Sequence, residues 1–385
     1  MTLELAKIGR QIEEMGKALA ARAGAEQKTL PDAQTLLHLF AEEQTLLREL
    51  AQTPGGKRLR CASPGDERLD LTRAAPPMPQ RADILGADGS QIYPDRHGLA
   101  FYFLVNVGGL VFRHGSGQAP EVRTWPRLYY AEQEVYPDGE PAGADLVNAL
   151  RSVAEVQALA DMVLAASTQG AARAALGDGP LLMWLGHTAI REAKQKELLD
   201  EYLGHLGRLR QAGTPAVGFV SRPHSAEVVA SLYMAQPDAR PVKGLHETRL
   251  RGLTDRALFD FLQPGERSAL FMRGTETNDA FRREGHAIWF FFLNTGADVA
   301  RVEVPEWVAQ RPAWLDLVHA VTYDQCRLNN GYPYVLTRAD ELAVIQGTER
   351  EVLEGMLVQE MIRQGLALPD LSRKAAQKRV ARWRK

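Results

Sequence analysis

Apolar residues recur at helical spacing through the first fifty positions of the chain, and charged residues fill the positions between them. The repeat is clearest at Leu36, Leu37, Phe40, Leu46, Leu47 and Leu50. This pattern predicts two helices. Between Pro54 and Pro79 it gives way to glycine, proline and charged residues, and the final prolines lack the N–H groups that regular structure needs. We therefore predict a helical N-terminal extension over residues 1–75.

Short apolar runs alternate with helical patterns in the rest of the chain. The runs that predict strands are residues 84–87, 101–111, 181–185, 217–220, 288–293 and 301–304. The segments whose length and period predict helices are residues 145–166, 188–212, 225–234 and 338–364. Residues 100–112, interrupted by Gly108 and Gly109, resemble a hairpin, so the early strands should be antiparallel and the later ones of the βαβ type. The order predicts one mixed sheet flanked by helices, an α/β fold.

Composition narrows the classes of protein that fit this pattern. With 385 residues, 45% of them hydrophobic and 24% charged, the chain has the make-up of a globular protein with a large core. A formal net charge of -2 means that contact with a nucleic acid must come from local basic patches. Cys61 and Cys326 are too few and too far apart for a disulfide framework or a zinc site.

The expected location follows from the apolar runs. No apolar leader follows the first methionine, and the longest apolar run, near residues 288–293, is too short to cross a bilayer. We therefore expect a cytoplasmic protein that makes no contact with a membrane. The chain also has no glycine-rich phosphate loop of the GxxxxGK[ST] type, so we do not expect it to hydrolyse ATP itself.

The first candidate for chemistry is Asp88-Gly89-Ser90, which follows an apolar run. An aspartate at the end of a strand can bind a divalent cation, and Gly89 lets the backbone turn sharply. The same three residues are also common in simple turns, and alone they fit that interpretation as well. A second candidate is the basic C-terminus, which is either a solvated end or a contact for phosphate groups.

Several segments in a fixed order resemble a known family. They are residues 86–90 (GADGS), 218–225 (GFVSRPHS), 290–293 (FFFL) with 301–305 (RVEVP), and 331–339 (GYPYVLTRA). They are similar to the opening Asp motif, the Gly-Tyr-Val-Ser-(Arg/Lys)-Pro segment, the strand pair ending in Arg-x-Glu-x-Pro, and the Tyr-Pro-x-x-Leu-x-x-Ala-His motif of the NurA family of DNA end-processing nucleases. The resemblance covers about residue 80 to the C-terminus.

The resemblance implies a fold and an activity. The fold would be an RNase H-like core over residues 80–345, followed by a C-terminal helical segment with a basic tail over residues 346–385. The activity would be metal-dependent DNA cleavage of the single-strand endonuclease and 5′–3′ exonuclease type, by a homodimer that works with a HerA-like hexameric ATPase. Phosphodiester hydrolysis of this kind uses two cations about 4 Å apart, and oxygen ligands suit Mn²⁺ or Mg²⁺.

The resemblance also places the family's acidic residues on this chain. Its first aspartate falls on Asp88. Its glutamate belongs on the following helix, where Glu155 is the closest candidate and Asp161 a second, unless both are exposed helix charges. Its second aspartate ends an apolar strand, and the run 181–185 places Leu185 at that position. Because leucine cannot bind a cation, this assignment departs from the family pattern.

The last motif supplies a second departure and suggests an exchanged site. The family tyrosine falls on Tyr332, and its histidine falls on Asp340. In a strand, His187 would lie on the same face as Leu185, so its imidazole could replace the missing carboxylate. We therefore predict a cation bound by Asp88, Glu155, His187 and Asp340, with Tyr332 orienting water or phosphate as a further catalytic residue.

Two alternatives without catalysis stay open. One is an impaired subunit that binds the ATPase and DNA without cleaving, and the other is a DNA-binding adaptor. In each case phosphate groups would pair with basic side chains. The candidates are Arg222, Arg282, Arg283, Lys374, Lys378 and Arg379.

Overall fold

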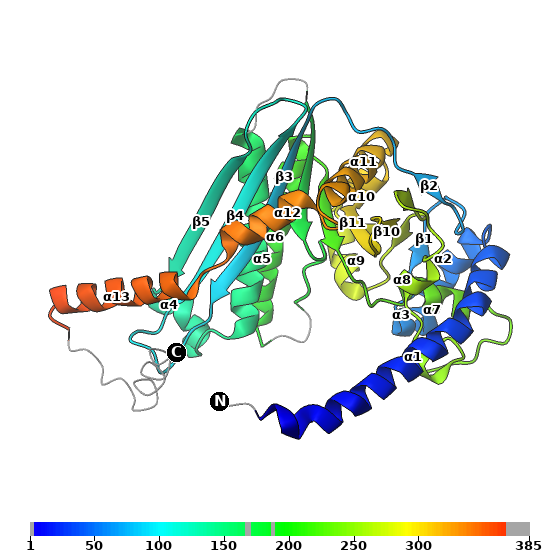
Figure 1. Cartoon of the computed structure of the whole chain (residues 1–385), viewed down its shortest axis with the longest axis horizontal. Helices are drawn as coiled ribbons and strands as arrows, with labels where there is room; N and C mark the ends of the chain where they lie inside the picture. Colours follow the sequence, from blue (N-terminus) through cyan, green and yellow to red (C-terminus); the bar gives the residue numbers. More distant parts are fainter. Residues whose placement is uncertain (1–3, 166–170, 186–188, 367–385) are drawn as a thin grey trace. The chain divides into compact units, whose positions relative to one another are not determined.

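A computed structural model of the chain describes residues 4–165, 171–185 and 189–366 (Figure 1). The chain forms two compact units, each built from separate segments. The first unit contains residues 1–78, 179–182 and 217–333, and the second contains residues 79–178, 183–216 and 334–385. Both combine strands with helices, which confirms the predicted mixed α/β class. The division into residues 1–75, 80–345 and 346–385 stays a prediction.

The second unit is built on four strands. They are β3 (Ala82–Ile92), β4 (Phe103–His114), β5 (Glu121–Tyr129) and β6 (Ala172–Asp178). β3, β4 and β5 form an antiparallel meander, and β6 lies parallel to β3 on its other side. A parallel neighbour requires a crossover, which helix α5 (Ala144–Ala165) provides. Three antiparallel strands followed by a helix and a parallel strand is the order of an RNase H-like fold.

Glycines in β3 and β4 let helices approach the two faces of this sheet. A Cβ on Gly108 would stand 2.5 Å from the carbonyl oxygen of Ala339 in helix α12 (Tyr334–Ala343), which crosses β3 and β4 in Figure 1. A Cβ on Gly109 would stand 2.9 Å from the sulfur of Met162 in α5. Because successive strand residues point to opposite faces, α12 covers one face and α5 the other. Helix α6 (Glu192–Gln211) packs against α5.

The remaining elements of the second unit are short or peripheral. They are α4 (Glu132–Val135), the 3-10 turn η1 (Pro137–Gly139) and α13 (Gly347–Arg363). α13 has no buried residue within its described length, unlike α12, whose apolar side packs on β3 and β4. The single helix predicted over residues 338–364 is therefore wrong, because the chain leaves the helical conformation at residues 344–346.

The first unit has its own antiparallel strands, in the order β1-β9-β10-β11-β7. These are β1 (Ser63–Pro64), β9 (Phe271–Met272), β10 (Ile288–Asn294), β11 (Val299–Pro305) and β7 (Ala216–Val220), with β2 (Arg73–Ala74) paired to β8 (Glu266–Arg267). Its helices are α1 (Leu5–Leu39), α2 (Gln44–Gln52), α3 (Pro54–Leu59), α7 (Glu227–Met234), α8 (Asp255–Leu258), η2 (Leu245–Glu247), α9 (Glu276–Arg283), α10 (Glu306–Ala309) and α11 (Pro312–Leu328).

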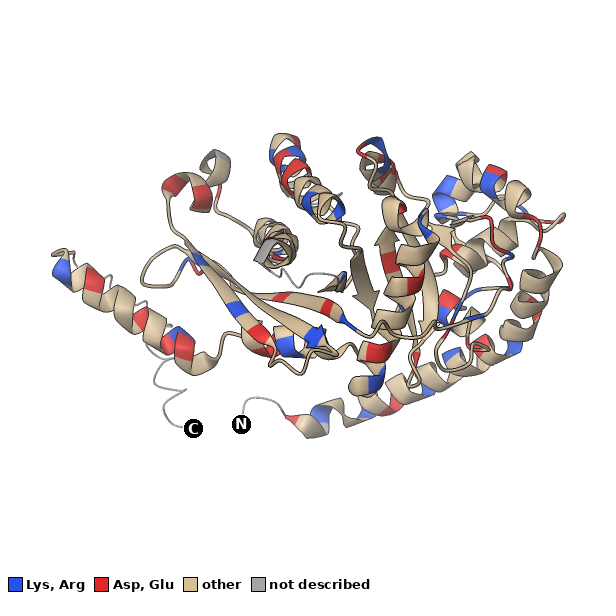
Figure 2. Cartoon of the chain, turned by 90° about the horizontal axis from the view of Figure 1, so that it is seen from above, with Lys and Arg blue, Asp and Glu red and all other residues tan. Residues whose placement is uncertain are grey.

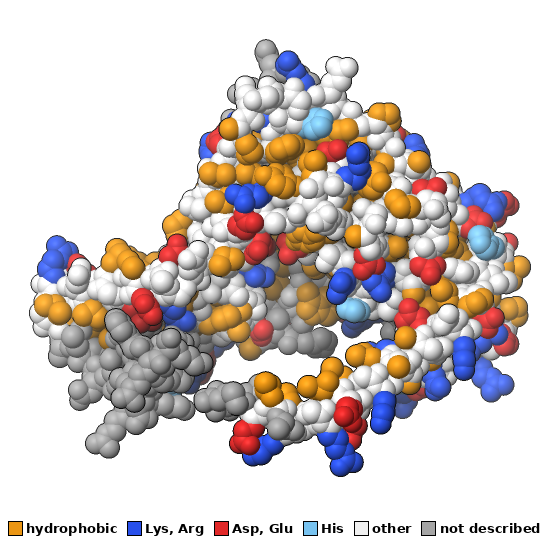
Figure 3. All heavy atoms as spheres, viewed as in Figure 1, with side chains coloured by type: hydrophobic (Ala, Val, Ile, Leu, Met, Phe, Trp, Pro, Cys, Tyr) orange, Lys and Arg blue, Asp and Glu red, His pale blue; other side chains and the backbone are white. Residues whose placement is uncertain are grey.

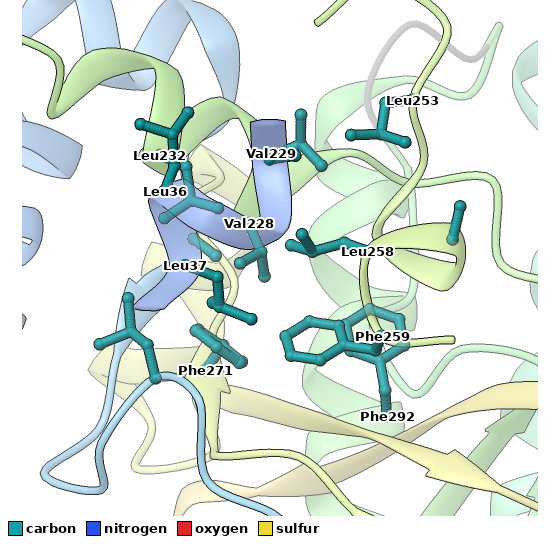
Figure 4. Close-up of a cluster of buried hydrophobic side chains, with 14 of the residues drawn as sticks. Leu36, Leu37, Val228, Val229, Leu232, Leu253, Leu258, Phe259, Phe271 and Phe292 are labelled. Carbon is teal, nitrogen blue, oxygen red and sulfur yellow. The ribbon is translucent and has the colours of Figure 1, made fainter. Parts of the chain in front are cut away.

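The core of the first unit joins segments that are far apart in the sequence (Figure 4). Leu37 near the end of α1 and Val229 of α7 are fully buried in the same cluster. Phe259 stacks on Phe292 with the ring centroids 4.9 Å apart. Removing so much apolar surface from water is the main stabilising contribution, at about 25 cal/mol for each Å². The helical N-terminal segment is therefore part of a core as well as an extension.

Two of the strand predictions are wrong. Residues 181–185 contain no described strand, because the parallel neighbour of β3 is β6, which ends at Asp178. Residues 100–112 are no hairpin, because β4 continues through Gly108 and Gly109 and pairs with β3 over its length. Within the described residues, no helix combines the length and the apolar character that crossing a bilayer requires.

Candidate metal centre

Acidic residues of the second unit lie near the point where β3 and β6 run side by side. The parallel register pairs Ala87 with Gly177, so the next residues, Asp88 and Asp178, are neighbours across the two strands. Adjacent strands lie about 4.8 Å apart, and paired residues face the same side of a sheet. Asp88 is also paired with Gly108, over which α12 packs through Ala339, and Asp340 follows directly on that helix.

The electrostatic state of Asp88 reflects this crowding. The pKa of its carboxyl group is raised to about 6, chiefly by burial and also by the negative charges of Asp178 and Asp340. Two groups act in the opposite direction: the Gly89 N–H, which donates to Asp88 Oδ1 at 2.7 Å, and the Arg151 guanidinium. The folded protein thus disfavours the ionised form of a carboxyl group that would be fully charged at neutral pH in water.

Glu155 reaches the same strand from α5. A Cβ on Gly89 would stand 2.6 Å from Glu155 Oε1, so this carboxylate occupies space that only a glycine leaves open. The pKa of Glu155 is raised to about 8, chiefly by burial; the positive charge of Arg151 acts to lower it, and the negative charges of Asp88 and Asp178 act to raise it. Arg151 Nε lies 3.3 Å from Glu155 Oε1, and Arg151 Nη1 donates to the Gly89 carbonyl oxygen at 3.3 Å.

This donor set has the chemistry of a site for a hard divalent cation. Carboxylate oxygens are the ligands that Mn²⁺ and Mg²⁺ prefer, and like charges this close are unfavourable without a compensating cation. Among the described residues, however, no three His, Cys, Asp or Glu side chains stand close enough together to hold a metal as placed. The residues therefore fit a cation by type and strand position, and ligation requires their side chains to turn toward one another.

Comparison with known proteins identifies the family. The family model of the NurA domain matches residues 82–345, which is more than half of the chain. The chain belongs to the NurA family. This is a family of nucleases, and the match includes all the carboxylates described above. No protein with a curated description matches the chain in sequence.

Solved structures are similar to the chain at low identity. The NurA nuclease from Sulfolobus solfataricus is 11% identical with a TM-score of 0.48, over 94% of this chain and 96% of that one. NurA bound to dAMP and manganese is 12% identical with a TM-score of 0.37, over 74% of this chain and 90% of that one. The catalytic domain of human endonuclease V is 15% identical with a TM-score of 0.33, over 83% and 97% of the two chains.

Asp178 is the residue of this site that the sequence analysis missed. The segment Asp178-Gly179-Pro180-Leu181 follows an apolar strand and has the form of the NurA motif Asp-Gly-Ser-Leu. The assignment of that motif to Leu185 is wrong, because it rested on a strand over residues 181–185 that the structure does not contain. The chain therefore keeps a carboxylate at the end of the strand next to Asp88.

The other predicted site residues have different outcomes. Asp88, Glu155 and Asp340 all lie in the second unit. The negative charges of Asp178 and Asp340 raise the pKa of Asp88, and the charge of Asp178 also raises the pKa of Glu155. His187 lies outside the described residues. Tyr332 belongs to the first unit, where its ring packs edge-on against Phe219 at 5.4 Å.

Asp161, the second candidate for the family glutamate, has another partner. Arg208 Nη2 of α6 donates to Asp161 Oδ1 at 2.6 Å, so this carboxylate helps to join α5 to α6. Asp88 and Glu155 have shifted pKa values whose causes do not include Asp161. Asp161 therefore has a structural partner on α6, and Glu155 stays the prediction for the family glutamate.

The predicted DNA-binding residues fall into two groups. Arg222, Arg282 and Arg283 are exposed in the first unit. Arg222 Nε is 3.9 Å from Asp298 Oδ2, and Arg282 Nη1 is 3.6 Å from Asp279 Oδ1, distances at which exposed pairs contribute little. The other group, Lys374, Lys378 and Arg379, lies outside the described residues.

Proposed function

We propose that the chain is a DNA nuclease that depends on a divalent cation. The observation that carries the proposal is the pair Asp88 and Asp178 on adjacent parallel strands within a NurA domain, with the charges of both acting on Glu155 of α5. The negative charge of Asp178 raises the pKa of both Asp88 and Glu155, and the negative charge of Asp88 raises the pKa of Glu155 as well. A protein keeps such an unfavourable cluster at a functional site, where charge is needed for binding or catalysis.

Each residue has a role in this proposal. Asp88, Asp178 and Glu155 would hold the cation, which is Mn²⁺ or Mg²⁺ because its ligands are carboxylate oxygens. A divalent cation in such a site activates water and stabilises the leaving oxygen of a phosphodiester. Asp340 adds negative charge from α12, and Arg151 holds Glu155 against Gly89 through the 3.3 Å contact of its Nε.

The substrate, the mode of cleavage and the partner are proposed from family membership. We propose that the substrate is DNA with single-stranded regions or ends, cut as an endonuclease and as a 5′–3′ exonuclease, and that a HerA-like hexameric ATPase works with the chain. Retention of Asp178 supports catalysis over the impaired subunit, because that alternative depended on the loss of this carboxylate.

We also propose a homodimer, which the exposed face of α1 supports. Leu5, Ile8, Ile12, Met15 and Leu19 repeat at alternating spacings of three and four, as in a two-stranded coiled coil. All but Ile8 have at least 53% of their surface exposed. In Figure 3 hydrophobic side chains run along one edge of this helix and charged ones along the other, and both signs of charge mark its ribbon in Figure 2.

Two glycines border this apolar stripe. Gly9 and Gly16 lie seven residues apart, and no described atom comes within 4 Å of where a Cβ would stand on either. Glycine inside an exposed helix costs about 1 kcal/mol relative to alanine, so a close helix partner would explain both. A second copy of α1 has the same spacing and the same small residues, which makes the stripe complementary to itself.

The nuclease proposal is tested with labelled single-stranded DNA and Mn²⁺, with and without the ATPase. We expect cleavage by the wild type, loss of cleavage in Asp178→Asn, and unchanged cleavage in the control Asp161→Asn. Binding of the ATPase without cleavage under any condition would instead establish the impaired subunit, and binding of DNA alone would establish the adaptor.

The dimer is tested by light scattering coupled to gel filtration. Ile12→Glu and Met15→Glu place charges in the middle of the stripe, and we expect each to yield monomers at concentrations where the wild type is dimeric. As a control, Lys17→Glu changes a charge on the opposite face and should leave the mass unchanged. Equal masses for all four proteins would rule out this surface as the dimer contact.

A further inference from the structure

A basic pocket of about 410 Å³ lies in the first unit, between the end of α3 and the start of α7. Arg58, Arg60, His224 and Arg273 line it, and Glu227 contributes the one carboxylate among its lining residues. Arg58, Arg60 and His224 are exposed, while Arg273 is partly buried. Three arginines against one glutamate make the lining positive in a chain whose overall charge is negative.

The negative charge of the Glu227 carboxylate is already neutralised by two arginines. Arg273 Nε lies 3.0 Å from Glu227 Oε1, and Arg301 Nη1, fully enclosed, lies 2.9 Å from Glu227 Oε2. Burial raises the pKa of Glu227, but these two guanidinium groups, which also pair with Glu303, hold it below its ordinary value. The paired carboxylate of Glu227 would therefore not repel an anion that enters the pocket.

The amides at the start of α7 are not available to such an anion. Asp255 Oδ2 accepts from Glu227 N at 2.8 Å, and Asp255 Oδ1 accepts from the N–H groups of Val228 and Val229 at 3.0 Å each. This side chain from α8 thus caps α7 from a distant part of the sequence. The arginine and histidine side chains are then the positively charged groups of the lining that can bind an anion.

The backbone of Arg60 gives an independent indication of function. Arg60 caps the C-terminus of α3 in the left-handed conformation, with φ 57° and ψ 43°, a position at which glycine is the usual residue. Among the described residues, Asn330 is the other non-glycine with a positive φ. Asparagine tolerates this conformation, whereas arginine is strained by it, and such strain is typical of positions kept for binding or catalysis.

We propose that Arg58, Arg60, His224 and Arg273 bind a backbone phosphate of the DNA strand, as a contact separate from the carboxylate site. The volume of the pocket admits a phosphate with part of its sugar, and guanidinium groups bind phosphate oxygens in a two-pronged geometry. The inference rests on the proposed function, because DNA is the substrate named there. It adds a place and a set of residues that hold the strand.

The decisive variant is Arg60→Gly, because we expect it to raise the stability of the protein and to lower its affinity for DNA. Glycine relieves the left-handed backbone, so we expect a higher melting temperature, and it removes a guanidinium, so we expect weaker DNA binding. The control Asn330→Gly also places glycine at a positive φ. It should leave DNA binding unchanged, since Asn330 does not line the pocket.

Binding is measured by fluorescence anisotropy of a labelled oligothymidylate in EDTA, so that no strand is cut. We expect the affinity of Arg60→Gly to fall about 5- to 10-fold near 100 mM salt. The slope of log affinity against log salt should become shallower by about 0.7, as for the loss of one phosphate contact with a single strand. Arg58→Gln, which leaves the backbone of α3 unchanged, should act in the same direction.

The outcomes separate this inference from the proposed function. Unchanged affinity and salt slope in both Arg60→Gly and Arg58→Gln would overturn the phosphate site, whether or not the wild type cleaves DNA. If the wild type binds the oligonucleotide, both variants weaken binding, and no Mn²⁺-dependent cleavage occurs, the phosphate site stands and the nuclease proposal fails.

Discussion

Replacing Asp88 by asparagine should stabilise the metal-free protein at neutral pH. The folded structure holds the pKa of Asp88 at about 6, above the ordinary value of 3.8, chiefly because the carboxyl group is removed from water. In the unfolded chain the Asp88 carboxyl group is ionised at neutral pH, so folding carries the free-energy cost of burying its negative charge. Asparagine has the same shape and can still accept the hydrogen bond from Gly89 N–H, but it carries no charge.

The size and pH range of the effect follow from the shift. One pKa unit corresponds to about 1.4 kcal/mol, so a shift of this size would reach about 3 kcal/mol, and water at this half-buried site reduces that to about 1–2 kcal/mol. Because the pKa is raised on folding, the penalty of Asp88 is absent below the unfolded value of 3.8, grows up to about 6 and is constant above. The advantage of Asp88→Asn should follow the same course.

Thermal unfolding in EDTA between pH 4 and pH 8 measures this difference. We expect equal melting temperatures at the acid end and a variant that melts about 2–5 °C higher at pH 8. Saturating Mn²⁺ should stabilise the wild type by about 3 kcal/mol at a concentration near 100 Kd and should not stabilise the variant. The control Asp161→Asn should keep the response to Mn²⁺. A difference between Asp88→Asn and wild type that does not vary with pH would refute the reasoning.

Three further substitutions test other parts of the structure. Gly89→Ala should displace Glu155 and lower cleavage at least 10-fold with little loss of stability, while Gly204→Ala, where a Cβ has open space, should leave cleavage unchanged; equal rates for both would contradict the role of Gly89. Glu227→Gln should lower the free energy of unfolding by about 3–5 kcal/mol in urea titrations, since it removes one of the two carboxylates that pair with the buried Arg301 and leaves that positive charge to Glu303, which also pairs with Arg273; a loss below about 1 kcal/mol would exclude this. Asp255→Ala should cost about 2 kcal/mol and expose the amides at the start of α7 to hydrogen exchange; unchanged protection there would contradict the capping role.

The strands with strong apolar patterns were predictable from the sequence, and those without them were not. β10 is nearly continuous in aromatic and aliphatic residues, so its position was predicted within one residue. β5 is mostly exposed and polar, and no strand was predicted there. β6 reads Ala-Arg-Ala-Ala-Leu-Gly-Asp, a composition with low strand propensity, and its assignment depends on pairing with β3 rather than on its own side chains.

The low strand propensity of β6 also explains the wrong assignment of Leu185 at the candidate metal centre. Residues 181–185 are more apolar than β6, so the sequence pattern predicted the strand several residues too late in the chain. The prediction therefore placed Leu185 where the family has an aspartate. Asp88 and Glu155 could be proposed from the sequence because each stands in a recognisable context, an Asp-Gly-Ser motif, which lies inside β3 rather than in a turn, and a long helix. Their proximity to Asp178 is a property of the sheet register, which no local pattern contains.

The most direct test of the account is a calorimetric titration with Mn²⁺ at pH 8 of three proteins: the wild type, Asp178→Asn and His187→Ala. We expect the wild type and His187→Ala to bind Mn²⁺ with equal affinity, and Asp178→Asn to lose the binding. Binding that survives in Asp178→Asn and disappears in His187→Ala would contradict it, because the cation would then be held by the imidazole and not by the carboxylate at the end of β6.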